Sequence, residues 1–169
     1  MKKLIISMLL ILPLLACAQT KKAKVLAGYT VDNYEVACIG VGTDGSKLIK
    51  IWGYGKKPEK AVLQAKSNAL HAVIFKGITA ASGGCQGIKP IASSFSVEEE
   101  NQEYFNNFFA PGGAYLNYIA MAGEGGNNMD VTKVDNKTYK VGIVVSVMYD
   151  AVRSELEKAG IVKGLGSGF

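Results

Sequence analysis

Residues 47–76, KLIKIWGYGKKPEKAVLQAKSNALHAVIFK, contain the change from strand to helix that decides the fold. The first part alternates as a strand does, and Ile49 and Ile51 fall on one side because side chains alternate along a strand. The second part begins at Pro58, a residue that the first turn of a helix tolerates, and its alanines recur every three or four residues. We therefore predict a strand, a glycine-rich turn, and a helix over 58–76 that packs closely on a sheet.

The other side of this strand, and the turn after it, hold the candidate contact residues. Trp52 and Tyr54 share that side, so they form a contact surface for a ligand or partner, or else they lie beneath another element with their polar tips in water. Lys56 and Lys57 follow in the turn, where lysines and the backbone N–H groups of a helix start attract anions. Pro58 removes one of those donors, and the phosphate-loop patterns are incomplete. A plain turn is therefore favoured over an anion site.

The N-terminus has the pattern of an export signal. Residues 1–17 combine a basic pair, an apolar run and the lipobox-like sequence Leu-Leu-Ala-Cys, which ends at Cys17. This pattern predicts a lipid on Cys17 and a basic linker over 18–29. Ordinary cleavage before Gln19 is the alternative, because Ala-Cys-Ala also satisfies the rule for small residues, and it would give a soluble exported protein.

Length and composition predict one folded domain. The chain has 169 residues, of which 49% are hydrophobic and 20% charged, with a formal net charge of +5. We expect a single domain over 30–160 and a flexible glycine-rich tail over 161–169. The chain has no basic stripe interleaved with aromatic residues, so we do not expect nucleic acid as a partner. In an oxidising compartment Cys38 and Cys85 either form a disulfide or remain separate buried thiols, and their spacing does not decide between the two.

The remaining elements predict an α+β fold, with a mostly antiparallel sheet of about four to five strands and two to three helices on one face. A capping box places Ser96 at the start of a second helix, and Asp150 is expected to cap the last helix. The expected strands lie at 34–42, 47–55, 114–123, 129–134 and 137–149, and the last helix lies at 151–159.

The chain offers no recognisable catalytic set. His71 is the only histidine, and the helical periodicity places it beside Ser67 and Asn68 on the polar side of the first helix, as a solvated surface residue. That helix lacks a carboxylate placed to orient the imidazole. The acids at 98–100 fit the first turn of a helix, where negative charge is favourable. We therefore predict a protein that is not an enzyme and has no metal site and no cofactor.

The order of these segments resembles a known family. A lipobox, a strand pair, the segment GYGKKPEKAVLQAKSNALHAVI and the closing segment YKVGIVVSVMYDAVRSELEKAGI are similar to the small bacterial envelope lipoproteins typified by a twenty-kilodalton membrane-associated lipoprotein. The related N-terminal module of a flagellar-assembly protein shows the same pattern. The resemblance implies an envelope location and a small α+β domain, without an established catalytic activity.

Together these observations predict a non-catalytic lipoprotein of the bacterial outer membrane. It would be anchored in the membrane through Cys17, face the periplasm and bind a protein or cell-wall partner. The alternatives are a soluble periplasmic or secreted module that binds a small anion or a glycan through Trp52, Tyr54, Lys56 and Lys57, and an enzyme of unknown class.

Overall fold

The computed structural model describes residues 34–42, 44–80, 85–92, 94, 96–123 and 129–164. The predictions for the signal peptide, Cys17 and the basic linker lie outside these residues, as does the end of the glycine-rich tail. Within the described residues, no helix has the length and apolar character needed to cross a membrane.

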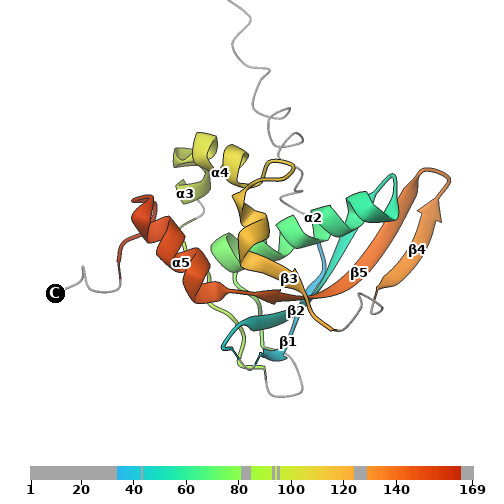
Figure 1. Ribbon diagram of the computed structural model, residues 1–169, viewed down its shortest axis with the longest axis horizontal. Helices are drawn as coiled ribbons and strands as arrows, with labels where there is room; N and C mark the ends of the chain where they lie inside the picture. Colours follow the sequence, from blue (N-terminus) through green and yellow to red (C-terminus); the bar gives the residue numbers. More distant parts are fainter. Residues whose placement is uncertain are drawn as a thin grey trace, which may run out of the picture.

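A five-stranded antiparallel sheet with β5 at its centre organises the domain (Figure 1). One edge of β5 pairs with β2, which in turn pairs with β1. The other edge of β5 is shared, because β4 pairs with its first half and β3 with its last three residues. The strands are β1 (Val36–Val41), β2 (Lys47–Gly55), β3 (Ile119–Met121), β4 (Asp130–Asp135) and β5 (Thr138–Val147). The predicted α+β fold and mostly antiparallel sheet are confirmed.

Helix α2 (Pro58–His71) covers one face of the sheet, against β2 and β5 (Figure 1). The strand residues on this inner face are fully buried, as their alternation predicts: Ile49, Ile51, Val141, Ile143, Val145 and Val147. The alanines of α2, spaced three or four residues apart, meet them and are fully buried too: Ala61, Ala65 and Ala69. Small side chains on the helix let its backbone approach the sheet closely.

Two glycines of β2 complete this close approach. A Cβ atom on Gly53 would lie 2.5 Å from the amide nitrogen of Ala65, and even closer to the carbonyl oxygen of Ala61. A Cβ on Gly55 would lie 2.6 Å from the Ala61 amide nitrogen. Both glycines therefore act as contact points for the helix backbone, which explains the Gly-Tyr-Gly segment without a bound phosphate.

The remaining helical elements come after α2 in the sequence. The helical segment continues from α2 through a π-helical turn (Ala72–Lys76), which ends at Gly77 with a φ of 71°. In Figure 1, α3 and α4 lie on the same side of the sheet as α2, and α5 follows β5 at one end. Their bounds are α3 (Ser96–Glu100), α4 (Gln102–Phe108), a 3-10 helix (Ala114–Tyr118) and α5 (Tyr149–Lys158).

Three local predictions were wrong. The segment 114–123 is not one strand, because it begins with the 3-10 helix, and only Ile119–Met121 pairs with β5. Tyr115 packs there against an aromatic ring of the α4 region, so tertiary packing overrides its β propensity. Ser96 is the first residue of α3, and its N–H donates to the hydroxyl of Ser94. Asp150 lies within the first turn of α5 and does not cap it.

A disulfide joins Cys38 of β1 to Cys85, with Cα atoms 6.0 Å apart. The two cysteines are separated by 47 positions, and the bond connects β1 to the segment that follows α2 and the π-helical turn. The disulfide thus links two segments that lie far apart in the sequence.

Candidate functional site

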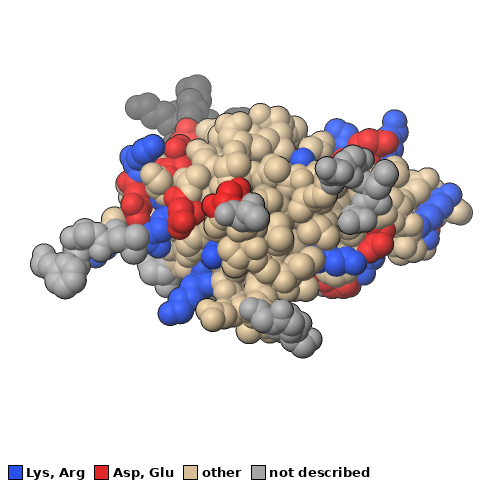
Figure 2. All heavy atoms as spheres, turned by 60° about the horizontal axis from the view of Figure 1, so that its bottom comes forward, with Lys and Arg blue, Asp and Glu red and all other residues tan. Residues whose placement is uncertain are grey.

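The candidate site lies on the outer face of the sheet, the face opposite α2. Strand alternation places Trp52 here, and the extensive contacts of α2 with β2 and β5 are on the other face. Figure 2 brings the lower side of Figure 1 forward, and a wide area without charged side chains separates charged groups at the two ends. On the outer face we define the Trp52 platform, which consists of Trp52, Gly142, Lys50, Lys140, Asp130 and Glu35.

The indole of Trp52 packs directly on the backbone of β5. Trp52 and Gly142 are opposite each other in the β2–β5 pairing. A Cβ on Gly142 would lie 2.7 Å from the indole Nε1 and 3.0 Å from Cδ1, so the missing side chain makes room for the ring. One face of the indole is thereby supported by the sheet, and the Trp52 side chain stays partly exposed.

Two lysines lie over the indole ring. The Nζ atoms of Lys50 and Lys140 lie 5.2 Å and 5.8 Å from the ring centroid, within cation–π distance. Each lysine also forms an ion pair, Lys50 with Asp130 at 2.8 Å and Lys140 with Glu35 at 2.7 Å. The hydrogen bond to Glu35 raises the pKa of Lys140, so this ammonium remains charged. The platform is therefore an aromatic surface framed by two neutralised pairs of charges.

The other predicted contact residues are placed differently. Tyr54 lies on the same face, exposed, with the Lys140 Nζ 5.9 Å from its ring. Lys56 and Lys57 are exposed in the turn before α2, and among the described residues no hydrogen bond or ion pair joins them to Trp52. Glu59 adds a negative charge in the first turn of α2. The structure therefore brings Trp52 and Tyr54 together on one face but leaves the two lysines outside the platform.

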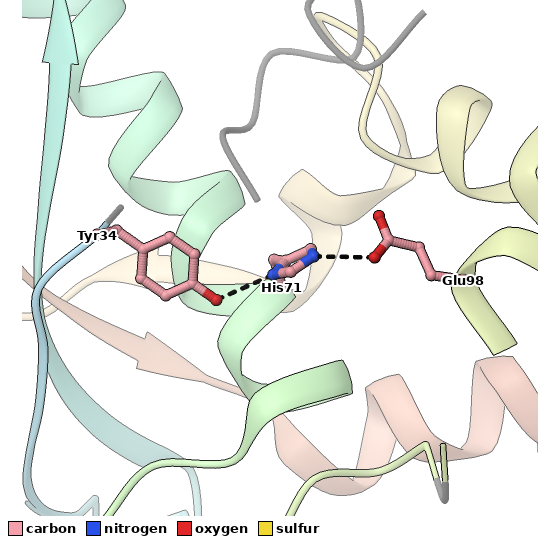
Figure 3. A network of polar contacts seen from close by, with 3 residues as sticks. All are labelled: Tyr34, His71 and Glu98. Atoms are coloured by element: carbon pink, nitrogen blue, oxygen red, sulfur yellow. Dashed lines mark hydrogen bonds and ion pairs between the residues drawn. The ribbon is translucent and has the colours of Figure 1, made fainter. Parts of the chain in front are cut away.

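A second cluster, centred on His71, overturns the prediction of a solvated histidine. The His71 side chain is 1% exposed and lies between two polar partners (Figure 3). Its Nδ1 is 2.9 Å from the hydroxyl of Tyr34, and its Nε2 is 3.3 Å from Oε2 of Glu98, a buried residue of α3. Ser67 and Asn68, which were predicted to be exposed with it, are buried as well.

One arrangement of hydrogens satisfies both contacts with a neutral imidazole. The Tyr34 hydroxyl then donates to Nδ1, and Nε2–H donates to the Glu98 carboxylate. The hydroxyl, imidazole and carboxylate have the order of a nucleophile, a base and an orienting acid. The Tyr34 hydroxyl, however, points inward to the buried ring, and Phe75 and Phe109 lie beside the imidazole. This geometry fits a link that fastens α2 to α3 and to the segment just before β1.

The prediction failed because the last turns of α2, with Ser67, Asn68 and His71, are covered by a second layer. The aromatic residues of α4 and its flanks, including Phe105 and Phe109, are buried in the same core as Phe75. The His71 ring contacts both Phe75 and Phe109. Helical periodicity separates the two sides of a helix but does not show whether the polar side meets water. One signal was available, since Ser67, Asn68 and His71 form a polar patch without lysine, arginine or acid.

Among the described residues, no group of three or more histidines, cysteines and acids could hold a metal ion. Comparison of the chain with protein-family models, with curated proteins and with solved structures finds no match. The geometry of the two clusters is therefore the basis for a functional proposal.

Proposed function

We propose that this protein is a non-catalytic lipoprotein of the bacterial envelope, anchored through Cys17, whose domain binds an envelope component through the outer face of its sheet. The observation that carries the binding role is the Trp52 platform. A tryptophan that is partly exposed on the sheet face opposite α2, with Tyr54 on the same face, has the character of a recognition surface, because aromatic residues dominate binding energy at interfaces. The lipobox supports the anchor.

The arrangement of the two sheet faces supports a binding role for the outer face. α2 buries the inner face, and the link between His71 and Glu98 fastens the layer above α2. A rigid scaffold of this kind holds the exposed side chains of the outer face in a fixed geometry, which lowers the entropic cost of binding.

An anion site at Lys56 and Lys57 has weaker support. Pro58 lacks a backbone N–H, and the carboxylate of Glu59 opposes a negative ligand at the start of the helix. The two lysines are exposed in the turn before α2. We therefore place recognition on the outer face and treat these lysines as solvated turn residues.

Cys17→Ala tests the anchor. We expect the native protein in the membrane fraction with the mass of acyl chains on Cys17, and the variant in the soluble fraction without that mass. Lys56→Ala with Lys57→Ala is the matched control, and it should stay in the membrane. A native protein that is soluble and begins at Gln19 would refute the anchor.

A photo-crosslinking residue tests the binding surface. Placed at Tyr54 in cells, it should attach to an envelope component, whereas the same residue placed at Leu63, on the exposed side of α2, should not. Equal labelling at the two positions would refute a role for the outer face.

A further inference from the structure

The chemistry of the Trp52 platform points to one class of ligand. We propose that the platform binds a neutral saccharide, with one sugar ring stacked on the indole of Trp52 and its hydroxyl groups bonded to the surrounding ion pairs. This inference rests on the proposed function, and it specifies the envelope component as a glycan rather than a protein.

The indole is held in a suitable position for stacking. Gly142 supports one face of the ring, because a Cβ there would come within 2.7 Å of Nε1. The face of an aromatic ring is negative, and the C–H groups of a sugar ring are weakly positive, so the two surfaces attract each other. A ring that already rests on the sheet loses little freedom when a ligand covers it.

The ion pairs supply the polar contacts that a sugar needs. Each sugar hydroxyl both donates and accepts hydrogen bonds, whereas a carboxylate only accepts and an ammonium only donates. The Lys50–Asp130 and Lys140–Glu35 pairs therefore offer both kinds of partner next to the indole, with the two ammonium groups over its ring. The side chains of Asp130 and Glu35 are 65% and 63% exposed, which leaves their carboxylate oxygens open to hydroxyl groups.

The charges of the platform favour a neutral ligand. The two ammonium groups beside the indole are each paired with a carboxylate, at 2.8 Å and 2.7 Å. An anion would therefore meet Asp130 and Glu35 as well as the lysines. A protein surface would have to remove water from both ion pairs, which is costly. The hydroxyl groups of a sugar can instead replace that water.

The test uses the detergent-solubilised full chain and a neutral amino-sugar chain, tetra-N-acetylchitotetraose, as the probe. Trp52 is the sole tryptophan, so its fluorescence reports directly on the platform. We expect a saturable change with a dissociation constant on the order of 1 mM or tighter. Cellotetraose is titrated in parallel as a second neutral saccharide. Inorganic phosphate is titrated as an anionic ligand. It should neither change the Trp52 fluorescence nor compete with the saccharide.

Two variants test the geometry by calorimetry. Trp52→Ala should weaken saccharide binding roughly tenfold or more, because it removes the stacking surface. Gly142→Ala keeps the tryptophan but displaces the indole from the sheet, and it should also weaken binding. Gly40→Ala is the matched control, because a Cβ there meets nothing within 4 Å. Circular dichroism of each variant verifies that it is folded.

Three results would overturn the inference: neither saccharide binds, binding is unchanged in Trp52→Ala, or phosphate competes with the saccharide. The saccharide inference and the membrane anchor of the proposed function can be refuted independently of each other. Saccharide binding in detergent does not depend on Cys17, and membrane attachment is measured without a ligand.

Discussion

Replacing Gly53 by alanine should destabilise the domain, because this residue sets the distance between β2 and α2. The added Cβ would lie 2.5 Å from the Ala65 amide nitrogen, a backbone atom that cannot rotate away. The helix must therefore move off the sheet, and α2 carries buried alanines along this contact. Overpacking costs about 1–3 kcal/mol, and a clash with backbone atoms belongs at the upper end of this range. Alanine recovers at most about 1 kcal/mol by restricting the unfolded chain, so we expect a net loss of about 2 kcal/mol.

Urea unfolding followed by circular dichroism measures this loss, with the disulfide kept oxidised. For a slope of about 2 kcal/mol/M, the midpoint should fall by about 1 M. Gly55→Ala should act in the same direction, because its Cβ would lie 2.6 Å from the Ala61 amide nitrogen. Gly40→Ala serves as the control, since it has open space around it and should change stability by less than about 0.5 kcal/mol. A Gly53→Ala protein as stable as this control would refute the close packing of α2 on β2.

Three further predictions concern the buried polar groups and the disulfide. Glu98→Ala leaves His71 buried without its carboxylate and should lower the free energy of unfolding by about 2–3 kcal/mol, whereas Glu99→Ala, at an exposed position, should have little effect in the same urea assay. Burial, followed by the charge of Glu155, raises the pKa of Tyr104 from the ordinary value of 10.0 to about 12. The unfolded chain therefore loses this proton first, so the contribution of Tyr104 to stability is complete below pH 10 and is lost as pH rises towards 12. Tyr104→Phe should flatten that decline, and an unchanged pH profile would contradict the shift. Removing the Cys38–Cys85 bond by a double serine substitution should cost about 4 kcal/mol for a separation of 47 positions, and thermal midpoints of the oxidised and substituted proteins would show it.

The strand-to-helix segment was predictable because its signals are local. Alternation identified the buried side of β2 and β5, Pro58 marked the start of α2, and Gly77 marked the end of the helical segment. The periods of two and 3.6 residues act within a few turns or positions, so they can be recognised without knowledge of the rest of the chain.

The His71 cluster and the Trp52 platform could not be predicted in full, because they form through contacts between segments that are distant in the sequence. Glu98 lies 27 positions from His71, and nothing near His71 in the sequence shows that α3 will supply a carboxylate. The platform is similar, since the sequence indicated Trp52 and Tyr54 but not Gly142 or the two ion pairs. Gly142, Lys140 and Asp130 come from other strands and Glu35 precedes β1, so the register of the sheet decides which of them meet Trp52 and Lys50.

The sequence by itself determined the α+β class, the strand-to-helix turn and the side of β2 on which the aromatic residues lie. Only the tertiary structure decided which polar residues are buried and which surround Trp52. The physical reason is that periodicity acts along one element, whereas burial and ion pairing depend on the elements that pack against it. For this chain, the polar residues in the last turns of α2 became part of the core, and Trp52 and Tyr54 on the outer face kept exposed surface in the part of the chain that the structure describes.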